Sequence, residues 1–313
     1  MKHFSIKPSI SVVIPAFKVK DHILGVVNSI GAEVQNIVII DDACPEKTGI
    51  YVKKFCNDKR VEVLFHKVNL GVGGAVKSGY QRAIDIGSDI IVKIDGDGQM
   101  DSSRIEELIR PIFMGEADYS KGNRFFSTSA ISAMPKLRII GNLGLSFMSK
   151  LSSGYYKILD PTNGFTAIRT ETLRRINLEK IDNGYFFESD MLFRLNLESS
   201  RVKDVPIPAI YNREKSNLKI GRVLIEFPLK HFRNFCKRIL YSYYLKDFSL
   251  PSIELPAGLF LLTFGTTLGI KSWIQSNTTN QAMQTGTIVL VAMSCIIGFQ
   301  LVLAFFDSDI KKE

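Results

Sequence analysis

Apolar residues recur along residues 9–215 in two alternating patterns. Short, nearly continuous apolar runs and segments of helical periodicity follow one another, with the runs at 11–15, 36–40, 61–65 and 89–94 and the helical segments near 21–31, 46–57, 73–86 and 102–114. Such runs favour strands covered on both faces, and helices between strands favour parallel pairing. The pattern predicts an α/β domain with a mostly parallel, Rossmann-like sheet that binds ligands at the carboxyl ends of its strands.

Two long apolar segments near the C-terminus differ from everything before residue 250. The first, 255–274, contains one charge, Lys271, whose ammonium can extend to the membrane interface, and the second, 286–306, is uncharged. Each is long enough to cross a hydrocarbon layer of about 30 Å. They predict two transmembrane helices joined by a polar turn at 275–285. The alternative is a pair of helices buried in a soluble core.

Positive charge is concentrated just before these segments. The chain has 313 residues, 45% of them hydrophobic, and a net charge of +9. Nine basic and three acidic residues lie between Arg213 and Asp247, so +6 of that charge precedes the first span. Positive flanks mark the cytoplasmic side of a span. The composition excludes a wholly disordered chain, and charge gathered beside a membrane span argues against a nucleic-acid binder.

The basic segment has helical periodicity. Phe232, Phe235, Ile239 and Tyr243 recur at helical spacing, with Lys230, Arg233 and Lys237 about half a turn away. This pattern predicts an amphipathic basic helix on an anionic membrane surface, and the alternative is a solvated helix packed on its own domain.

The N-terminus and the cysteines bear on the compartment. The first residues have neither a long apolar region nor a cleavage site, and the four cysteines form no C-x-x-C pair. We therefore expect no secretory signal, no disulfide framework and no structural zinc site. The expected organisation is a cytosolic catalytic domain at 1–215, a basic amphipathic juxtamembrane region at 216–250, and two transmembrane helices with a short cytoplasmic tail at 251–313.

Carboxylates follow two of the predicted strands. Asp41 and Asp42 end the second strand, and Asp95 and Asp97 end the fourth. Two carboxylates separated by one residue at a strand end can share Mg²⁺ or Mn²⁺ with a diphosphate. The same spacing also opens a calcium loop of the EF-hand type, but Met100 stands where that loop requires glycine, and a strand precedes the segment.

The glycine-rich segment 69–79 invites a phosphate-loop interpretation. Val76 stands where both the Walker A and the G-x-G-x-x-G patterns require glycine, so neither fits. Two alternatives remain. The glycines either bring backbone close to a nucleotide or let a helix pack closely on its strand.

Eight motifs occur in an order that resembles family 2 glycosyltransferases of the dolichyl-phosphate mannose synthase type: VVIPAF, IIDD, NLGVGGAVKSG, KIDGDGQMD, GNRF, DPTNGF, YFFESDMLFRL and VPIPAIYNREKSNLK. With the basic helix and two spans, the chain resembles a bacterial polyprenyl-phosphate glycosyltransferase. The resemblance implies a GT-A fold and an inverting, metal-dependent transfer of one sugar. The donor would be a nucleotide sugar, UDP-hexose being preferred, and the acceptor undecaprenyl phosphate at the cytoplasmic face of the inner membrane.

The resemblance also implies roles for individual residues. Asp95 and Asp97, with Gln99, resemble the metal and diphosphate site, and Arg124 and Arg138 resemble arginines that hold the acceptor phosphate. The remaining donor contacts would come from a nucleoside pocket and a closing loop, formed by Pro15, Ala16, Phe17, Asp41 and Asp42, and by Arg213, Ser216 and Lys219.

A catalytic base is the least defined part of the site. A phosphomonoester has its second pKa near about 6, so the acceptor oxygen is largely deprotonated at neutral pH and needs no strong base. Asp160 ranks first among carboxylates placed for base or sugar contacts, ahead of Glu188 and Asp190.

Three positions depart from the family pattern. Val19 replaces an acidic residue, Ala43-Cys44 replaces Gly-Ser, and Lys215 replaces a glycine of the closing loop.

A processive polysaccharide synthase should carry a Q-x-x-R-W element, yet the only tryptophan is Trp273. A membrane scaffold without catalysis is a second alternative, and a homo-oligomer stays open.

Overall fold

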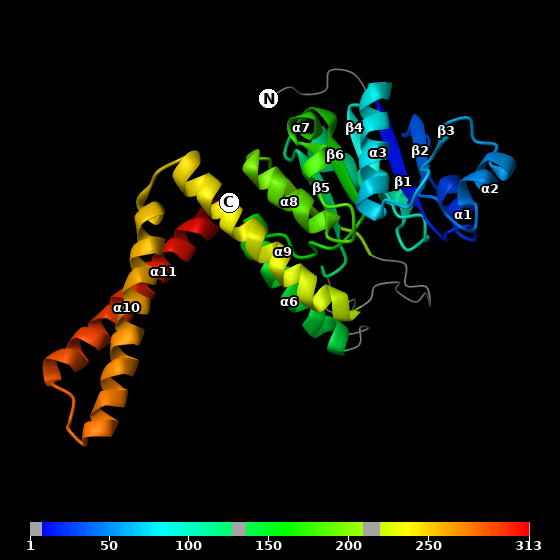
Figure 1. The fold of residues 1–313 in the computed structure, drawn as a ribbon. Coiled ribbons are helices and arrows are strands. Elements are labelled where there is room, and N and C mark those ends of the chain that lie inside the picture. Colours follow the sequence, from blue (N-terminus) through cyan, green and yellow to red (C-terminus); the bar gives the residue numbers. More distant parts are fainter. Residues whose placement is uncertain (1–7, 127–135, 209–219, 313) are drawn as a thin grey trace. The chain divides into compact units, whose positions relative to one another are not determined.

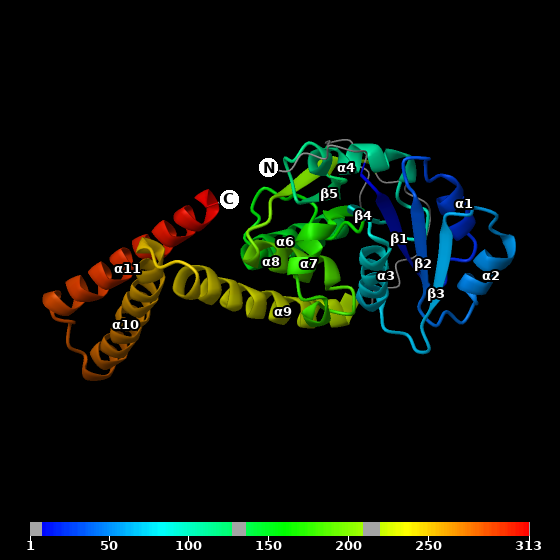
Figure 2. The same cartoon turned by 90° about the horizontal axis from the view of Figure 1, so that it is seen from above.

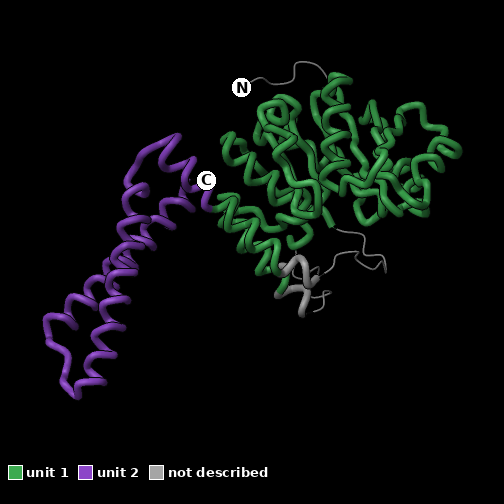
Figure 3. Tube along the Cα trace, in the orientation of Figure 1, with its two compact units in different colours: residues 1–235 green, residues 236–313 purple. Residues whose placement is uncertain are grey.

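The computed structural model describes residues 8–126, 136–208 and 220–312. The chain forms two compact units, Met1–Phe235 and Cys236–Glu313, which Figure 3 draws in green and purple. The division falls inside helix α9 (Ile220–Leu240) rather than at the expected boundaries of 215 and 250.

The first unit is built on a seven-stranded sheet of order β3-β2-β1-β4-β6-β5-β7 (Figures 1 and 2). Only β6 runs antiparallel to its neighbours. The four strands expected from apolar runs are confirmed, and the strands are β1 (Ile10–Ala16), β2 (Asn36–Asp41), β3 (Val61–Phe65), β4 (Ile90–Lys93), β5 (Tyr119–Asn123), β6 (Thr166–Arg169) and β7 (Val202–Pro206). The mostly parallel α/β fold is confirmed.

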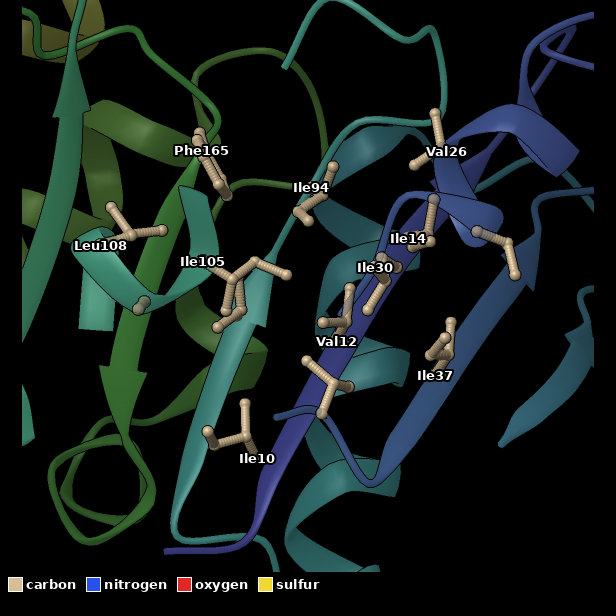
Figure 4. Close-up of a cluster of buried hydrophobic side chains, with 14 of the residues drawn as sticks. Ile10, Val12, Ile14, Val26, Ile30, Ile37, Ile94, Ile105, Leu108 and Phe165 are labelled. Carbon is tan, nitrogen blue, oxygen red and sulfur yellow. The ribbon is translucent and has the colours of Figure 1, made fainter. Parts of the chain in front are cut away.

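Helices cover both faces of this sheet. On one face, Val12 and Ile14 of β1 pack with residues of α1, α2 and α4, such as Ile105 and Leu108 (Figure 4). On the other face, Val13 packs with residues of α3, α7 and α8. The bounds are α1 (Ile23–Asn28), α2 (Thr48–Phe55), α3 (Val72–Ile86), α4 (Ile105–Phe113), α7 (Thr170–Arg175) and α8 (Phe187–Leu197), with short 3₁₀ turns at Ser102–Arg104 and Leu178–Lys180.

Strands β5, β6 and β7 lack the apolar runs of the first four. β5 reads YSKGN, yet all five residues are buried. Its polar groups find partners inside the protein, as when the Ser120 hydroxyl donates to the Leu108 carbonyl at 2.5 Å. Because β6 runs backwards between β4 and β5, the loop before it lies at the carboxyl ends of those strands. That placement brings the DPTNGF segment to the edge where ligands are expected.

The first turns of α9 belong to the first unit. Phe227 packs edge-on against Phe186 at 5.3 Å between ring centroids. His231 shares a hydrogen bond of 2.7 Å with Ser152 of α6 (Lys136–Ser153), and Asn234 donates to Asp190 at 2.9 Å. These contacts explain why the unit extends to residue 235.

The prediction that one apolar face of the basic segment lies on a membrane surface is wrong for its second half, Ile239 and Tyr243. Ile239 and Tyr243 are buried, whereas Phe232 is exposed. The helical repeat is interrupted by a π-helical turn at Tyr241–Leu245, and Tyr243 packs against Phe305 within the second unit, with 5.2 Å between ring centroids.

The second unit is a helical hairpin of α10 (Leu250–Thr279) and α11 (Thr285–Lys311), and both helices are long and apolar enough to cross a membrane. A Cβ at Gly258 would lie 2.9 Å from the Gly298 carbonyl oxygen, so glycine permits the close approach. α10 continues beyond the expected span to Thr279, and the hydroxyls of Thr278 and Thr279 donate to the Gln275 carbonyl at 2.9 and 2.8 Å.

Candidate active site

The first carboxylate of the D-x-D motif is held by a buried lysine. Lys93 ends β4, is 1% exposed, and places Nζ 2.7 Å from Asp95 Oδ1 and 3.1 Å from Glu188 Oε1 on α8. Burial lowers the pKa of Lys93, but the two carboxylates outweigh this effect and raise the pKa above the ordinary lysine value. Lys93 is therefore a fixed positive charge beneath the motif.

Asp97 lies beyond a tight turn from Asp95. Its Oδ1 accepts a hydrogen bond of 3.0 Å from the backbone N–H of Gln99, and Gly98 between them has a φ of +74°. Carboxylate oxygens suit Mg²⁺ and Mn²⁺, which often keep ligands from water or phosphate. No group of three or more His, Cys, Asp or Glu side chains in the described parts of the chain could hold a metal ion alone. Two carboxylates alone would leave most of the coordination shell of such an ion to other oxygen ligands.

Gly164 of the DPTNGF segment lies directly against the Lys93–Asp95 pair. A Cβ at residue 164 would lie 2.3 Å from Lys93 Nζ and 2.6 Å from Asp95 Oδ2. Any larger residue would have to displace the ion pair. The DPTNGF segment and the D-x-D motif are therefore in direct contact at Gly164.

Arg124 and Asp160, both expected to be catalytic, bind each other. The guanidinium donates from Nε to Asp160 Oδ2 at 2.7 Å and from Nη2 to Oδ1 at 3.0 Å. Asp160 is fully buried, whereas the Arg124 side chain is 23% exposed. The carboxylate thus orients a guanidinium that stays accessible at one edge.

The segment after Asp160 is fastened to β5. Asn163 donates from Nδ2 to the Gly122 carbonyl at 2.7 Å, and Lys121 donates from Nζ to the Asn163 carbonyl. Burial lowers the pKa of Lys121 to about 8, although Glu188 and Asp160 oppose the shift. The loop that carries Asp160 and Gly164 is thereby fixed to the strand that carries Arg124.

Asp41 and Asp42 are both buried and bind backbone. Asp41 accepts the N–H groups of Cys44 and Gly49 at 2.7 and 2.6 Å, at the start of α2. Asp42 accepts the N–H groups of Leu70 and Gly71, each at 2.9 Å, and contacts His66 Nδ1 at 2.7 Å. Their visible role is to shape the loops after β2 and β3.

The other residues expected to bind the donor are distributed unevenly. Pro15 and Ala16 end β1, where Ala16 is buried, and Phe17 is 40% exposed. Arg213, Ser216 and Lys219 lie outside the described residues. Arg138 lies in α6, and its side chain is also outside the described part of the structure.

The glycine-rich segment packs against protein. Gly71 has a φ of +84°, and a Cβ at Gly73 would lie 2.3 Å from the Asp182 carbonyl oxygen. A Cβ at Gly79 would lie 2.2 Å from Val13 of β1. Close packing of α3 on its strand and on the 182–184 loop accounts for these glycines.

Sequence patterns missed a polar row that crosses the sheet beneath the site. In strand register, Lys93, Thr166, Lys121 and Asp204 are successive neighbours on β4, β6, β5 and β7. Burial raises the pKa of Asp204 to about 6, and its Oδ2 accepts the Leu159 N–H at 2.7 Å. The available signal was a lysine inside an apolar run, as in DIIVKI, because a buried lysine needs a specific partner.

Comparison with known proteins shows the family to which this chain belongs. The model of the family described as "Glycosyl transferase family 2" matches residues 11–176. A UDP-N-acetylglucosamine–dolichyl-phosphate N-acetylglucosaminyltransferase of Methanococcus voltae is 30% identical, over 70% of this chain and 92% of that protein. An undecaprenyl-phosphate mannosyltransferase of Micrococcus luteus is 30% identical, over 59% of this chain and 76% of that protein.

A solved structure supports the fold. Glucosyl-3-phosphoglycerate synthase from Mycobacterium tuberculosis, in complex with Mn²⁺, uridine diphosphate and phosphoglyceric acid, matches with a TM-score of 0.55 and 18% identity. The match covers 74% of this chain and 78% of that one. The sheet, the motif order and the family match agree, and the chain belongs to glycosyl transferase family 2 as a glycosyltransferase of the GT-A fold.

Proposed function

We propose that this glycosyltransferase transfers one sugar from a nucleotide-sugar donor, preferably a UDP-hexose, to a polyprenyl phosphate at a membrane surface. Two relatives named for polyprenol-type acceptors support the lipid, and the D-x-D motif supports the donor diphosphate. The observation that carries the proposal is a catalytic unit whose last helix packs by one face and exposes an apolar stripe on another.

That stripe consists of Ile225, Leu229 and Phe232, which are 68, 66 and 67% exposed. They lie four and three residues apart, so they share one side of α9. The face that carries Phe227, His231 and Asn234 is packed instead. An apolar stripe with Arg233 and Lys237 exposed beside it suits an anionic membrane surface.

The second unit supplies a membrane anchor in this proposal. Most side chains in the apolar windows of α10 and α11 are exposed, which a soluble core helix would not tolerate. Arg238 pairs with Asp309 through two hydrogen bonds of 2.7 and 2.8 Å, so the segment before α10 meets the end of α11. Both ends therefore lie on one side of the hairpin, and the positive charge before α10 supports our proposal that this side faces the cytoplasm at a bacterial inner membrane.

Chemistry at the site would follow from the charges in place. Mg²⁺ or Mn²⁺ at Asp95 and Asp97 would stabilise negative charge on the leaving diphosphate. Arg124, oriented by Asp160, would bind the acceptor phosphate through charge-assisted hydrogen bonds. An ionised phosphate is already nucleophilic, so Asp160 acts by holding Arg124 rather than as a base.

A radiolabel transfer assay tests the proposal. Purified full-length protein is incubated with undecaprenyl phosphate, Mn²⁺, and UDP-glucose, UDP-galactose, UDP-N-acetyl sugars or GDP-mannose in turn. We expect one lipid-linked monosaccharide product with one of these donors. Absence of any lipid-linked product would favour the non-catalytic scaffold, and a growing glycan chain would favour the processive synthase.

A further inference from the structure

Lys93 differs from an ordinary surface ion pair in its surroundings. Its side chain is 1% exposed, against 31% for Asp95 and 12% for Glu188. It lies between a carboxylate of the D-x-D motif and a carboxylate of α8, at 2.7 and 3.1 Å. A charge buried in this way is retained only with specific partners.

Gly164 restricts the pair from another side. The space that a Cβ would fill there is 2.3 Å from Lys93 Nζ and 2.6 Å from Asp95 Oδ2. The ammonium is thus packed against the DPTNGF segment as well as paired with two carboxylates. Its position, and with it the position of Asp95, is fixed by three separate parts of the chain.

The charge of Lys93 matters for a divalent cation. Without it, Asp95, Asp97 and Glu188 would be three carboxylates near one strand end, which would attract a cation strongly. With it, Asp95 Oδ1 is already paired with an ammonium. In the described parts of the chain, no group of three or more His, Cys, Asp or Glu side chains could hold a metal ion. A cation then needs oxygen ligands from another source.

We propose that Lys93 is a positioning residue that occupies one oxygen of Asp95 and so makes divalent-cation binding depend on the nucleotide diphosphate. The inference rests on the proposed function, because the diphosphate belongs to the sugar donor. It assigns a role to Glu188 as well, since this residue draws part of the Lys93 charge away from Asp95.

Two substitutions should act in opposite directions. Lys93→Met keeps an unbranched side chain that is one atom shorter and removes its charge. This change leaves Asp95 and Glu188 uncompensated and should tighten Mn²⁺ binding without nucleotide. Glu188→Gln leaves Lys93 paired with Asp95 alone and should weaken Mn²⁺ binding without nucleotide. A merely structural role would predict weaker binding in both variants.

The experiment is an electron paramagnetic resonance titration of Mn²⁺ into full-length, detergent-purified protein, with and without UDP. We expect UDP to tighten binding to the wild type by about tenfold or more, and Lys93→Met to tighten nucleotide-free binding by about tenfold. Lys59→Met is the control for the loss of one positive charge, because Lys59 is an exposed lysine before β3, at the amino ends of the parallel strands, whereas the D-x-D motif follows the carboxyl end of β4. It should shift nucleotide-free Mn²⁺ binding by less than about threefold.

Equal or weaker nucleotide-free binding in Lys93→Met would overturn the proposal, as would a wild type that binds Mn²⁺ equally well without UDP. If Lys93→Met does not fold, Glu188→Gln decides, because unchanged or tighter binding there contradicts the charge argument. Failure of the proposed function is separate, since it would show as no sugar transfer by the wild type whatever the Mn²⁺ titration gives.

Discussion

Arg124 and Asp160 form a bidentate ion pair, with 2.7 Å from Nε to Oδ2 and 3.0 Å from Nη2 to Oδ1. The pair joins the end of β5 to the DPTNGF segment across 36 residues of sequence. Since Asp160 is fully buried, loss of Arg124 would remove a charged partner that its carboxylate cannot replace with bulk water. The relationship makes Arg124 both a stabilising residue and a candidate phosphate ligand, and substitutions can separate the two roles.

Arg124→Lys keeps the positive charge but loses the planar two-point contact. We expect the KM for polyprenyl phosphate to rise by about tenfold or more with a smaller change in stability, whereas Arg124→Ala should also destabilise the fold by about 3 kcal/mol because it strands Asp160. Steady-state kinetics and thermal unfolding measure the two effects. A wild-type KM in Arg124→Lys would argue against the acceptor role.

Two glycine substitutions form a matched pair for the packing of α3. A Cβ at Gly73 would lie 2.3 Å from the Asp182 backbone oxygen, while a Cβ at Gly25 would meet nothing within 4 Å. Gly73→Ala should destabilise the protein by about 1–3 kcal/mol, and Gly25→Ala in α1 should be neutral or stabilising by up to about 1 kcal/mol. Thermal unfolding of both variants checks this. Equal melting temperatures would contradict the packing explanation.

His231 should make the docking of α9 sensitive to acid. Burial lowers its pKa to about 4. The unfolded chain, with a pKa near about 6.5, binds the proton first, so stability falls as the pH drops from about 6.5 toward 4, by up to about 3 kcal/mol.

The difference between wild type and His231→Asn, measured by unfolding at pH 7.5 and 5, isolates this effect from other acidic groups. We expect the variant to lose less stability on acidification than the wild type. Parallel curves for the two proteins would show that His231 does not titrate as its burial implies.

Asp204 should act in the opposite sense. Burial raises its pKa to about 6, so the folded protein holds the proton more tightly than the unfolded chain. Its contribution is complete below about pH 3.8 and is lost as the pH rises through about 6. Asp204→Asn removes the charge and should stabilise the protein at pH 8 by about 1–3 kcal/mol, with little gain at pH 4. Destabilisation at pH 8 would mean that the favourable contacts of the carboxylate, such as the hydrogen bond from the Leu159 N–H, outweigh the cost of its burial.

The sequence predicted the parts of the fold in which pattern and burial agree. Strands β1 to β4 are mostly apolar, and the two C-terminal helices are long and uncharged over most of their length. β5 escaped prediction because YSKGN is polar, and its burial depends on partners such as Leu108 and Asn163 that lie elsewhere in the sequence.

The candidate site shows the same limit. Motifs placed Asp95, Asp97, Arg124 and Asp160 near one edge, because parallel strands end there. No local pattern could show that Asp160 holds Arg124, since that pair depends on the antiparallel return of β6, or that Lys93 also contacts Glu188, which lies on α8.

The most direct test of the central claim compares sugar transfer to undecaprenyl phosphate by the wild type, Asp97→Ala and Asp85→Ala. Asp85 is an exposed carboxylate near the C-terminal end of α3 and serves as the matched control. We predict lipid-linked product from the wild type and Asp85→Ala, and a loss of at least about a hundredfold in Asp97→Ala with membrane insertion intact. Full transfer activity in Asp97→Ala would contradict the assignment of the site.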